Sequence, residues 1–204
     1  MCKVYPEDVA MEIGLPDFPG LIEQFIYNQQ HPNNASDDSS LNFPTFYSKI
    51  MIYPSAVATF HAPSDISGVG GMRRKHIHAV KSWRKGAGCY DTIFINTNSS
   101  MEGMGGLDVA HTQLFFHFLM RASNTRAPLS SGSDELIGMW KVEPDQDQTL
   151  AVIHLDTIVR AVHLLPVFGP GCVSRSLSFT NTLDTFYRFY INKYVDHHVF
   201  EIAH

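Results

Sequence analysis

The sequence predicts an α+β fold: a small antiparallel, barrel-like sheet with an N-terminal helix and a C-terminal amphipathic helix. The 204 residues include fourteen Phe and eight Tyr, and such aromatic enrichment favours strands. Short apolar runs recur at about ten-residue spacing between turn residues, as in small barrels and sandwiches. Near both ends, apolar residues instead repeat every three to four positions, which is typical of helices. We expect a leader and flanking helix over residues 1–45 and a β-rich domain over residues 46–204.

The first part of the chain contains one clear helical pattern. Residues 1–16 hold Pro6, Gly14 and Pro16 without clean periodicity, so a loose leader is expected. A helix is predicted from Asp17, a candidate N-cap, to the breaker sequence His31-Pro32-Asn33-Asn34. Its apolar positions are Phe18, Leu21, Ile22, Phe25 and Ile26. The polar stretch 35–40 is predicted to be a surface loop.

Two strands and a helix are expected next. Weak alternation predicts strands over Phe46–Tyr53 and Val57–His61, followed by a glycine-bearing turn at residues 64–71. Met72–Val80 is predicted to form a short helix that stops at the turn Ser82–Gly86.

The second half is more regular. Strands are predicted over Tyr90–Ile95 and Leu107–Phe118, joined by a Gly-, Asn- and Ser-rich hairpin connection. Further strands are expected at Met139–Val142, Leu150–Leu155 and Ala161–Phe168. The final helix, at about residues 180–200, rests on helical spacing of Leu183, Phe186, Tyr187, Tyr190, Tyr194 and His197.

Charge, hydropathy and cysteine content narrow the class of protein. A net charge of -5 argues against a protein that coats polyanions generally. No apolar run approaches the roughly 18 residues of a membrane span, and no secretory leader is visible. Cys2, Cys89 and Cys172 are odd in number and form no CxxC motif, so neither a disulfide framework nor a cysteine-rich zinc site is expected. An intracellular, reducing compartment is predicted.

One segment concentrates positive charge. Six of the fifteen Lys and Arg residues fall within thirteen positions, next to a tryptophan. The candidate nucleic-acid-binding residues are Arg73, Arg74, Lys75, Lys81, Trp83, Arg84 and Lys85. Such cations contact phosphates, and an indole stacks on a base or sugar. The alternative is a solvated face that balances the acidic remainder of the chain.

Metal and catalytic motifs give weaker signals. His76 and His78 point to one side of an extended chain, but basic neighbours surround them and no Asp, Glu or Cys nearby in the sequence offers a third ligand. Asp196, His197 and His198 are consecutive, so on a helix they diverge by about 100° per residue. No metal site, cofactor or catalytic residue is therefore predicted.

Enzyme signatures are also missing from the sequence. It contains no GxSxG motif, and Gly68, Gly70 and Gly71 match neither a Walker A loop nor GxGxxG. A two-metal nuclease would have to recruit Asp91, Asp108 and Asp156 from separate segments.

Several segments resemble a known family. They are Phe60-His61-Ala62-Pro63-Ser64-Asp65, Gly68-Val69-Gly70-Gly71-Met72-Arg73-Arg74, Ser82-Trp83-Arg84, Tyr90-Asp91, Val152-Ile153-His154-Leu155-Asp156, Asn192-Lys193-Tyr194 and Asp196-His197-His198. Together they resemble the C-terminal region of transposon-derived proteins of mushroom-forming fungi, of the Plavaka or Kyakuja-Dileera-Zisupton type. The strand-rich middle is also similar in pattern to the β-domain that follows the catalytic core of plant CACTA-type transposon proteins.

The resemblance implies a non-catalytic, accessory tail, because in such proteins the nuclease residues belong to an upstream RNase H-like domain that this chain does not match. One departure lies at residues 121–133, which are polar and carry Pro128 where the family has an apolar strand with a tryptophan. We expect a loop over about residues 121–135 and a fold of marginal stability.

The leading hypothesis is thus an accessory domain of a transposon-derived protein that binds DNA through the basic segment and works in the nucleus. One alternative is a protein-interaction module that uses a sheet edge. The other is a metal-dependent hydrolase that uses His76, His78, His197 or His198.

Overall fold

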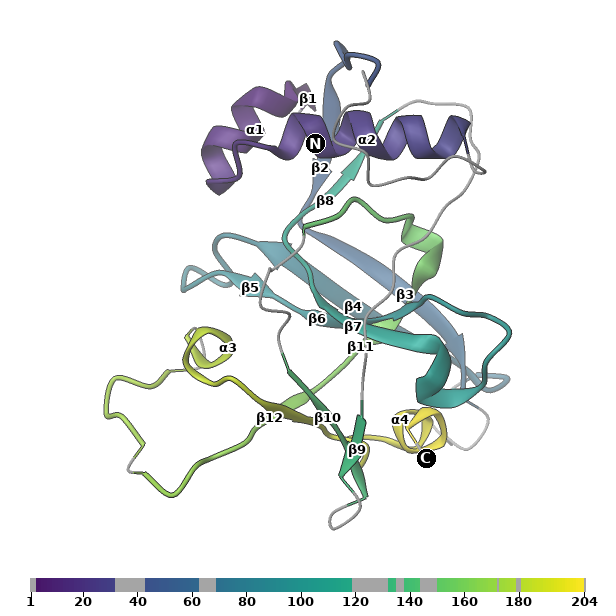
Figure 1. Ribbon diagram of the computed structural model, residues 1–204, viewed down its shortest axis with the longest axis vertical. Helices are drawn as coiled ribbons and strands as arrows, with labels where there is room; N and C mark the ends of the chain where they lie inside the picture. Colours follow the sequence, from purple (N-terminus) through teal and green to yellow (C-terminus); the bar gives the residue numbers. More distant parts are fainter. Residues whose placement is uncertain are drawn as a thin grey trace. The chain divides into compact units, whose positions relative to one another are not determined.

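A computed structural model describes residues 3–31, 43–62, 69–118, 132–134, 138–143, 150–171, 173–178 and 181–203. The fold mixes helices with small antiparallel sheets, as predicted (Figure 1). The chain divides into two compact units. The first unit comprises Met1–Tyr53, Leu114–Ala127 and Thr149–Leu155, and the second comprises Pro54–Gln113, Pro128–Gln148 and Asp156–His204.

The first unit pairs two helices with a three-stranded sheet. The helices are α1 (Pro6–Ile13) and α2 (Phe18–Gln30), and the strands run in the order β1 (Lys3–Val4), β2 (Ile50–Tyr53) and β8 (Phe115–His117). The core of this unit consists of Val9, Ala10, Phe18, Ile22, Ile26 and Ile50. Burial of this apolar surface is what holds helices and sheet together.

The expected loose leader at residues 1–16 is wrong, because α1 and β1 lie within it. Pro6 occupies the first turn of α1, where its missing N–H costs nothing. Gly14 ends the helix in the left-handed region with a φ of +73°. The helix predicted to begin at Asp17 is confirmed as α2. The polar stretch 35–40 lies outside the described residues.

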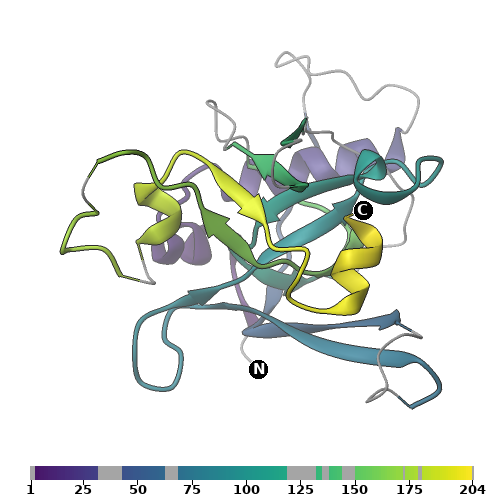
Figure 2. The same ribbon diagram turned by 90° about the horizontal axis from the view of Figure 1, so that it is seen from below.

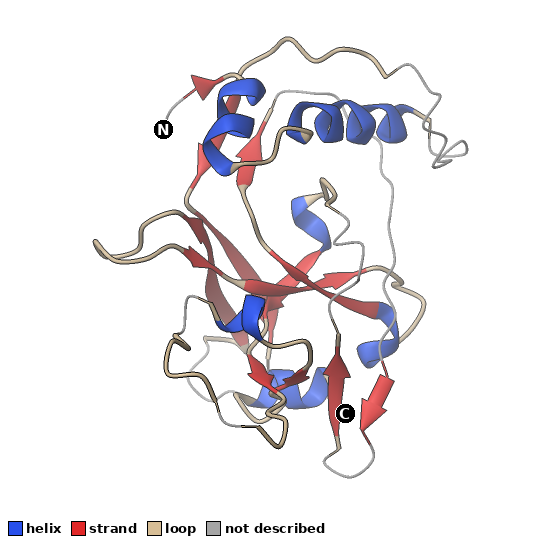
Figure 3. Cartoon of the chain, turned by 60° about the vertical axis from the view of Figure 1, so that its left-hand side comes forward, coloured by secondary structure: helices blue, strands red, loops and turns tan. Residues whose placement is uncertain are grey.

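The second unit contains three small sheets (strands in red in Figure 3). The first has the order β3 (Ser55–His61), β4 (Met72–Val80), β5 (Cys89–Tyr90), and the second β11 (Ile158–Ala161), β6 (Thr92–Asn96), β7 (Leu107–His111). The third has the order β12 (Leu164–Pro166), β13 (Phe189–Ile191), β10 (Met139–Val142), β9 (Gly132–Asp134). Within the described residues, these sheets do not close into a barrel.

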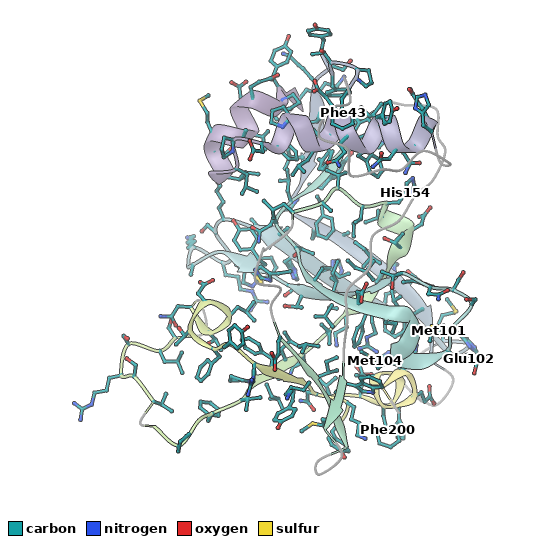
Figure 4. The ribbon with its side chains drawn as sticks, in the orientation of Figure 1. Phe43, Met101, Glu102, Met104, His154 and Phe200 are labelled. Atoms are coloured by element: carbon teal, nitrogen blue, oxygen red, sulfur yellow. The ribbon has the colours of Figure 1, made fainter. Side chains whose placement is uncertain are left out.

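Short helices complete the second unit: η1 (Gly103–Gly106), α3 (Thr182–Thr185) and α4 (His197–Ile202), while η2 (Leu155–Thr157) spans the boundary between the units. The core of the second unit consists of Phe94, Met104, Ile191, Val199 and Ala203. Figure 4 labels Met104 on η1 next to α4, where its side chain joins this core.

Two predicted helices are wrong, and the first of them is a strand. Met72–Val80 forms β4, which pairs antiparallel with β3 along its first seven residues, from Met72↔His61 to His78↔Ser55. Buried Ile77 and Ala79 alternate with less buried neighbours, a period of two that the cluster of charged residues obscured.

The predicted helix at residues 180–200 is also wrong, since this stretch contains α3, β13 and α4. Phe189 and Ile191 are buried while Tyr190 is less so, and this alternation matches a strand. In a run with many aromatic residues, the apolar positions fit the spacing of a helix and of a strand equally well. Periodicity alone therefore led to the wrong prediction.

The predicted strand Leu107–Phe118 is interrupted, since β7 pairs with β6 whereas β8 pairs with β2 in the other unit. The predicted strand Leu150–Leu155 is also wrong, since residues 150–154 have no regular structure and Leu155 begins η2. Part of the expected loop at residues 121–135 is strand β9, which pairs with β10 through Ser133↔Trp140. Residues 121–131 and Glu135 lie outside the described residues.

Candidate functional site

The basic segment forms a β-hairpin of the second unit. Arg73, Arg74 and Lys75 lie on β4, and Lys81, Trp83, Arg84 and Lys85 lie on the connection to β5, which extends away from the sheet in Figure 1. Between residues 72 and 90 the sequence contains six cations and no carboxylate. Hence the hairpin, defined as residues 72–90, is a local concentration of positive charge in an acidic chain.

Strand alternation divides these cations between two faces. Arg74 and His76 share a face with His78, whereas Arg73 and Lys75 share the face of buried Ile77. The predicted contact residues therefore do not form one flat patch.

The tip of the hairpin is a tight turn. The Gly86 N–H donates to the Trp83 carbonyl at 2.8 Å, and Arg84 and Lys85 have φ values of +50° and +64°. Two successive left-handed residues are characteristic of the type I′ turn that suits the twist of a hairpin. Asn and Gly are the residues favoured at these two positions. Arg84 and Lys85 therefore adopt a left-handed backbone conformation that is energetically unfavourable for residues with long side chains.

The indole of Trp83 lies next to this turn and is 40% exposed. Its ring centroid is 4.2 Å from that of His78, and the Arg84 guanidinium carbon is 5.5 Å from the indole centroid. The aromatic surface is thus kept beside cations while part of it faces solvent.

The second face of β4 meets an ion-pair network that the sequence analysis missed. Arg160 of β11 is fully buried, and its Nη1 and Nη2 donate to Asp196 Oδ1 and Oδ2 at 2.9 and 2.5 Å. Asp196 also caps α4 by accepting from the Val199 N–H at 3.0 Å. The signal available in the sequence was a lone arginine in the apolar run Ile158–Val162, which needs a buried partner.

A pocket of about 220 Å³ opens beside this network. Its lining residues are Phe60, Arg73, Arg74, Lys75, His76, Asp196 and His198. Lys75 Nζ lies 3.7 Å from Asp196 Oδ2, and Figure 2 shows α4 (yellow) beside the β3–β4 pair (blue). Three cations against one carboxylate give the rim a net positive charge, which suits an anion.

The pKa values in this network follow from the contacts. Burial raises the pKa of Asp196, but hydrogen bonds from Arg160 and the Val199 N–H, with the charges of Arg160 and Lys75, outweigh it and lower the pKa to about 2. Burial, followed by the Arg160 charge, lowers the pKa of His198. Its Nδ1 accepts from Arg160 Nη1 at 2.9 Å, which only the unprotonated nitrogen can do.

The histidines weighed for metal binding separate into different environments. His198 stacks on Phe60 with ring centroids 4.4 Å apart and is engaged with Arg160, while His197 is exposed. His76 is exposed, and its ring centroid lies 6.3 Å from that of His78.

His78 instead meets Cys89 and Asp91. One ligand atom from each of these three residues lies within 4.8 Å of the others, and no other such group of His, Cys, Asp and Glu occurs in the part of the chain that the structure describes. The sequence offered no Asp, Glu or Cys near His78 as a further metal ligand. That expectation is wrong, because the fold brings Cys89 and Asp91 next to His78. The carboxylates of Asp91, Asp108 and Asp156 do not form a nuclease-like cluster in that same part of the chain.

Comparison with known proteins gives no family assignment: no family model, curated protein or solved structure matches the chain. Among the described residues, no helix has the length and apolar character needed to cross a membrane.

Proposed function

We propose that this chain is a non-catalytic accessory domain of a transposon-derived protein, and that its hairpin binds nucleic acid. The observation that carries the proposal is the hairpin itself, which carries six cations and no carboxylate and holds the 40% exposed indole of Trp83 beside Arg84 at its tip. Lys and Arg side chains bind the phosphate backbone, and an accessible aromatic ring beside them stacks on a base. The resemblance of the sequence to transposon-derived proteins supports the accessory role.

The two faces of β4 have different roles in this proposal. Arg84 and Lys85 at the tip contact phosphates next to the base on which Trp83 stacks, and Arg74, further along β4, contacts a more distant phosphate of the same strand. Lys75 is already 3.7 Å from Asp196, so it contributes less to binding than these exposed cations. The pocket beside Asp196 accepts one further phosphate, since its rim carries more cations than carboxylates.

The test is fluorescence anisotropy with a labelled single-stranded oligonucleotide and its duplex at several salt concentrations. The variant R74A/R84A/K85A should weaken binding about tenfold or more and reduce the slope of log K against log salt by about 2 for the single strand. Lys3, Lys49 and Arg175 are exposed cations outside the hairpin, so K3A/K49A/R175A, which also removes three positive charges, is the control for lost net charge. A flat salt response of the wild type, or equal losses in both variants, overturns the proposal.

A second readout follows the indole directly. The chain has two tryptophans, and Trp140 packs against the core of the second unit. In a W140F variant, the oligonucleotide should quench the remaining Trp83 emission and shift it. Binding without any change in emission contradicts stacking on Trp83.

A protein partner at a sheet edge is the second candidate. β5 pairs with β4 at Ala79 and Val80, so among the described strands the edge of β4 opposite β3 has no strand partner over residues 74–77. Arg74, Lys75 and His76 there disfavour addition of another strand, because charges protect sheet edges. A partner retained by R74A/R84A/K85A in pull-down experiments, with nucleic-acid binding lost, would favour this second function.

A further inference from the structure

We propose that His78, Cys89 and Asp91 form a zinc-binding site at the base of the hairpin. None of the three ligands is among the residues proposed to contact nucleic acid, so the site can be tested separately. Nitrogen, sulfur and oxygen donors together are a ligand set that zinc takes in proteins.

Strand pairing brings the three residues together. The register Ala79↔Tyr90 and Val80↔Cys89 places His78 opposite Asp91, and the Asp91 N–H donates to the His78 carbonyl at 2.9 Å. Since side chains alternate along a strand, Cys89 and Asp91 point to the same side as His78. The ligands thus come from adjacent antiparallel segments, one histidine on β4 and a C-x-D pattern at β5, joined by the hairpin.

The ligand atoms of the three residues are close enough to be brought to one ion. His78 Nδ1 lies 2.9 Å from Asp91 Oδ2, and Cys89 Sγ lies 3.8 Å from Asp91 Oδ1. A tetrahedral zinc ion separates nitrogen and oxygen ligands by about 3.3 Å and sulfur and oxygen ligands by about 3.5 Å. These two distances run to the two different oxygens of the Asp91 carboxylate, and the ligand atoms of all three residues lie within 4.8 Å of one another, so rotation of the side chains is needed to bring them to one ion.

The surroundings orient the ligands. The Asp91 carboxylate accepts from the His78 backbone N–H at 2.7 Å, and the Thr112 hydroxyl donates to the carbonyls of Asp91 and His78 at 2.6 and 3.1 Å. Trp83 covers the His78 ring. Such outer contacts fix the direction of metal ligands and sustain affinity.

Charge and access also agree with a dication. A Cys89 thiolate and the Asp91 carboxylate together neutralise Zn²⁺, and binding releases the thiol proton to solvent. Arg73 and Lys75 point to the opposite face of β4, so they do not crowd the ion as the linear sequence suggested. The side chains of His78 and Asp91 are 19% and 30% exposed, which leaves a path for the ion and for water as the fourth ligand.

The first experiment is calorimetric titration of the chelator-treated full chain with Zn²⁺. One tight equivalent is expected, and H78A, C89S and D91A should each weaken it at least about tenfold. H76A, C172S and D184A are the matched controls, since each makes the same substitution elsewhere in the chain, and they should leave this affinity unchanged. Absence of a tight equivalent, or a loss in H76A equal to that in H78A, overturns the site.

A second experiment leaves all three ligands in place. In a C2S/C172S background Cys89 is the one remaining thiol, so its alkylation can be followed alone. Zn²⁺ should slow alkylation at least about tenfold, because a metal-bound thiolate is protected, whereas Mg²⁺ should have no effect since it avoids sulfur ligands. Co²⁺ should produce a thiolate-to-metal charge-transfer band. An unchanged alkylation rate with Zn²⁺ overturns the proposal even if the ligand variants misfold.

Discussion

Arg160 and Asp196 form a two-bond ion pair in which the arginine is fully buried and the aspartate side chain is 28% exposed. The guanidinium carbon also lies 4.6 Å from the centroid of the Phe60 ring. Through this pair β11, β3 and the start of α4 are joined in the second unit. A buried cation depends on its partner, because an unpaired charge in the interior is strongly unfavourable.

The variant D196A should therefore destabilise the protein by about 3–5 kcal/mol, since it leaves Arg160 buried without a counter-charge. It also removes the N-cap of α4. Urea denaturation followed by circular dichroism measures the change. The exposed residue Asp184 provides the control D184A, which should cost less than about 0.5 kcal/mol. Similar losses in the two variants would contradict a structural role for the pair.

Stability should decrease as the pH falls below about 6.5. The pKa of His198 is lowered by burial and by Arg160, so its contribution is complete above the unfolded-state value of 6.5 and is lost as the pH falls through the folded value. Asp196, with a folded pKa of about 2 against 3.8, adds a second loss below pH 3.8.

The measurement is the free energy of unfolding between pH 8 and pH 4. H198N keeps an acceptor for Arg160 but does not titrate, so it should flatten the curve just below about pH 6.5. Some slope should persist there, because burial also lowers the pKa of His111. A curve for H198N that overlies the wild type would show that His198 carries none of this dependence.

The sequence predicted those elements whose signal is local. The apolar spacing after Asp17 identified α2, because a helix is specified by neighbours three and four residues away. β4 and β13 were missed because charge and aromatic density hid an alternation that only burial reveals. β7 and β8 are separate strands because they pair with different partners, β6 and β2. The local sequence pattern does not indicate with which strand a segment pairs.

In the candidate sites, too, only residues that are close together in the sequence could be predicted. The basic hairpin is contiguous in sequence, so its residues were identified even though its first half was predicted to be a helix. Arg160 and Asp196 are 36 residues apart, and His78 and Asp91 are joined only through the register of β4 and β5. Such contacts depend on tertiary structure, which composition and spacing do not reveal.

Substitutions in the turn at the hairpin tip should increase the stability of the protein. R84N/K85G places the residues that a type I′ turn favours at the two positions with positive φ, so it should stabilise the protein by about 1 kcal/mol. R84A/K85A removes the same two charges without relieving the backbone and is the matched control. Thermal unfolding measures both variants. An equal rise in Tm for the two variants would assign the gain to charge instead of backbone conformation.

Gly105 and Gly106 of η1 should respond very differently to a methyl group. A Cβ on Gly106 would lie 2.5 Å from the Asn98 carbonyl oxygen and 2.6 Å from that of Met101, and both atoms belong to a backbone that holds the turn before β7. At Gly105 the nearest atom is the flexible Met101 Cε, at 3.0 Å. G106A should thus cost about 1–3 kcal/mol or more by overpacking, and G105A much less, as measured by urea denaturation. Equal tolerance of the two substitutions would mean that the Asn98–Gly106 turn is looser than its hydrogen bonds indicate.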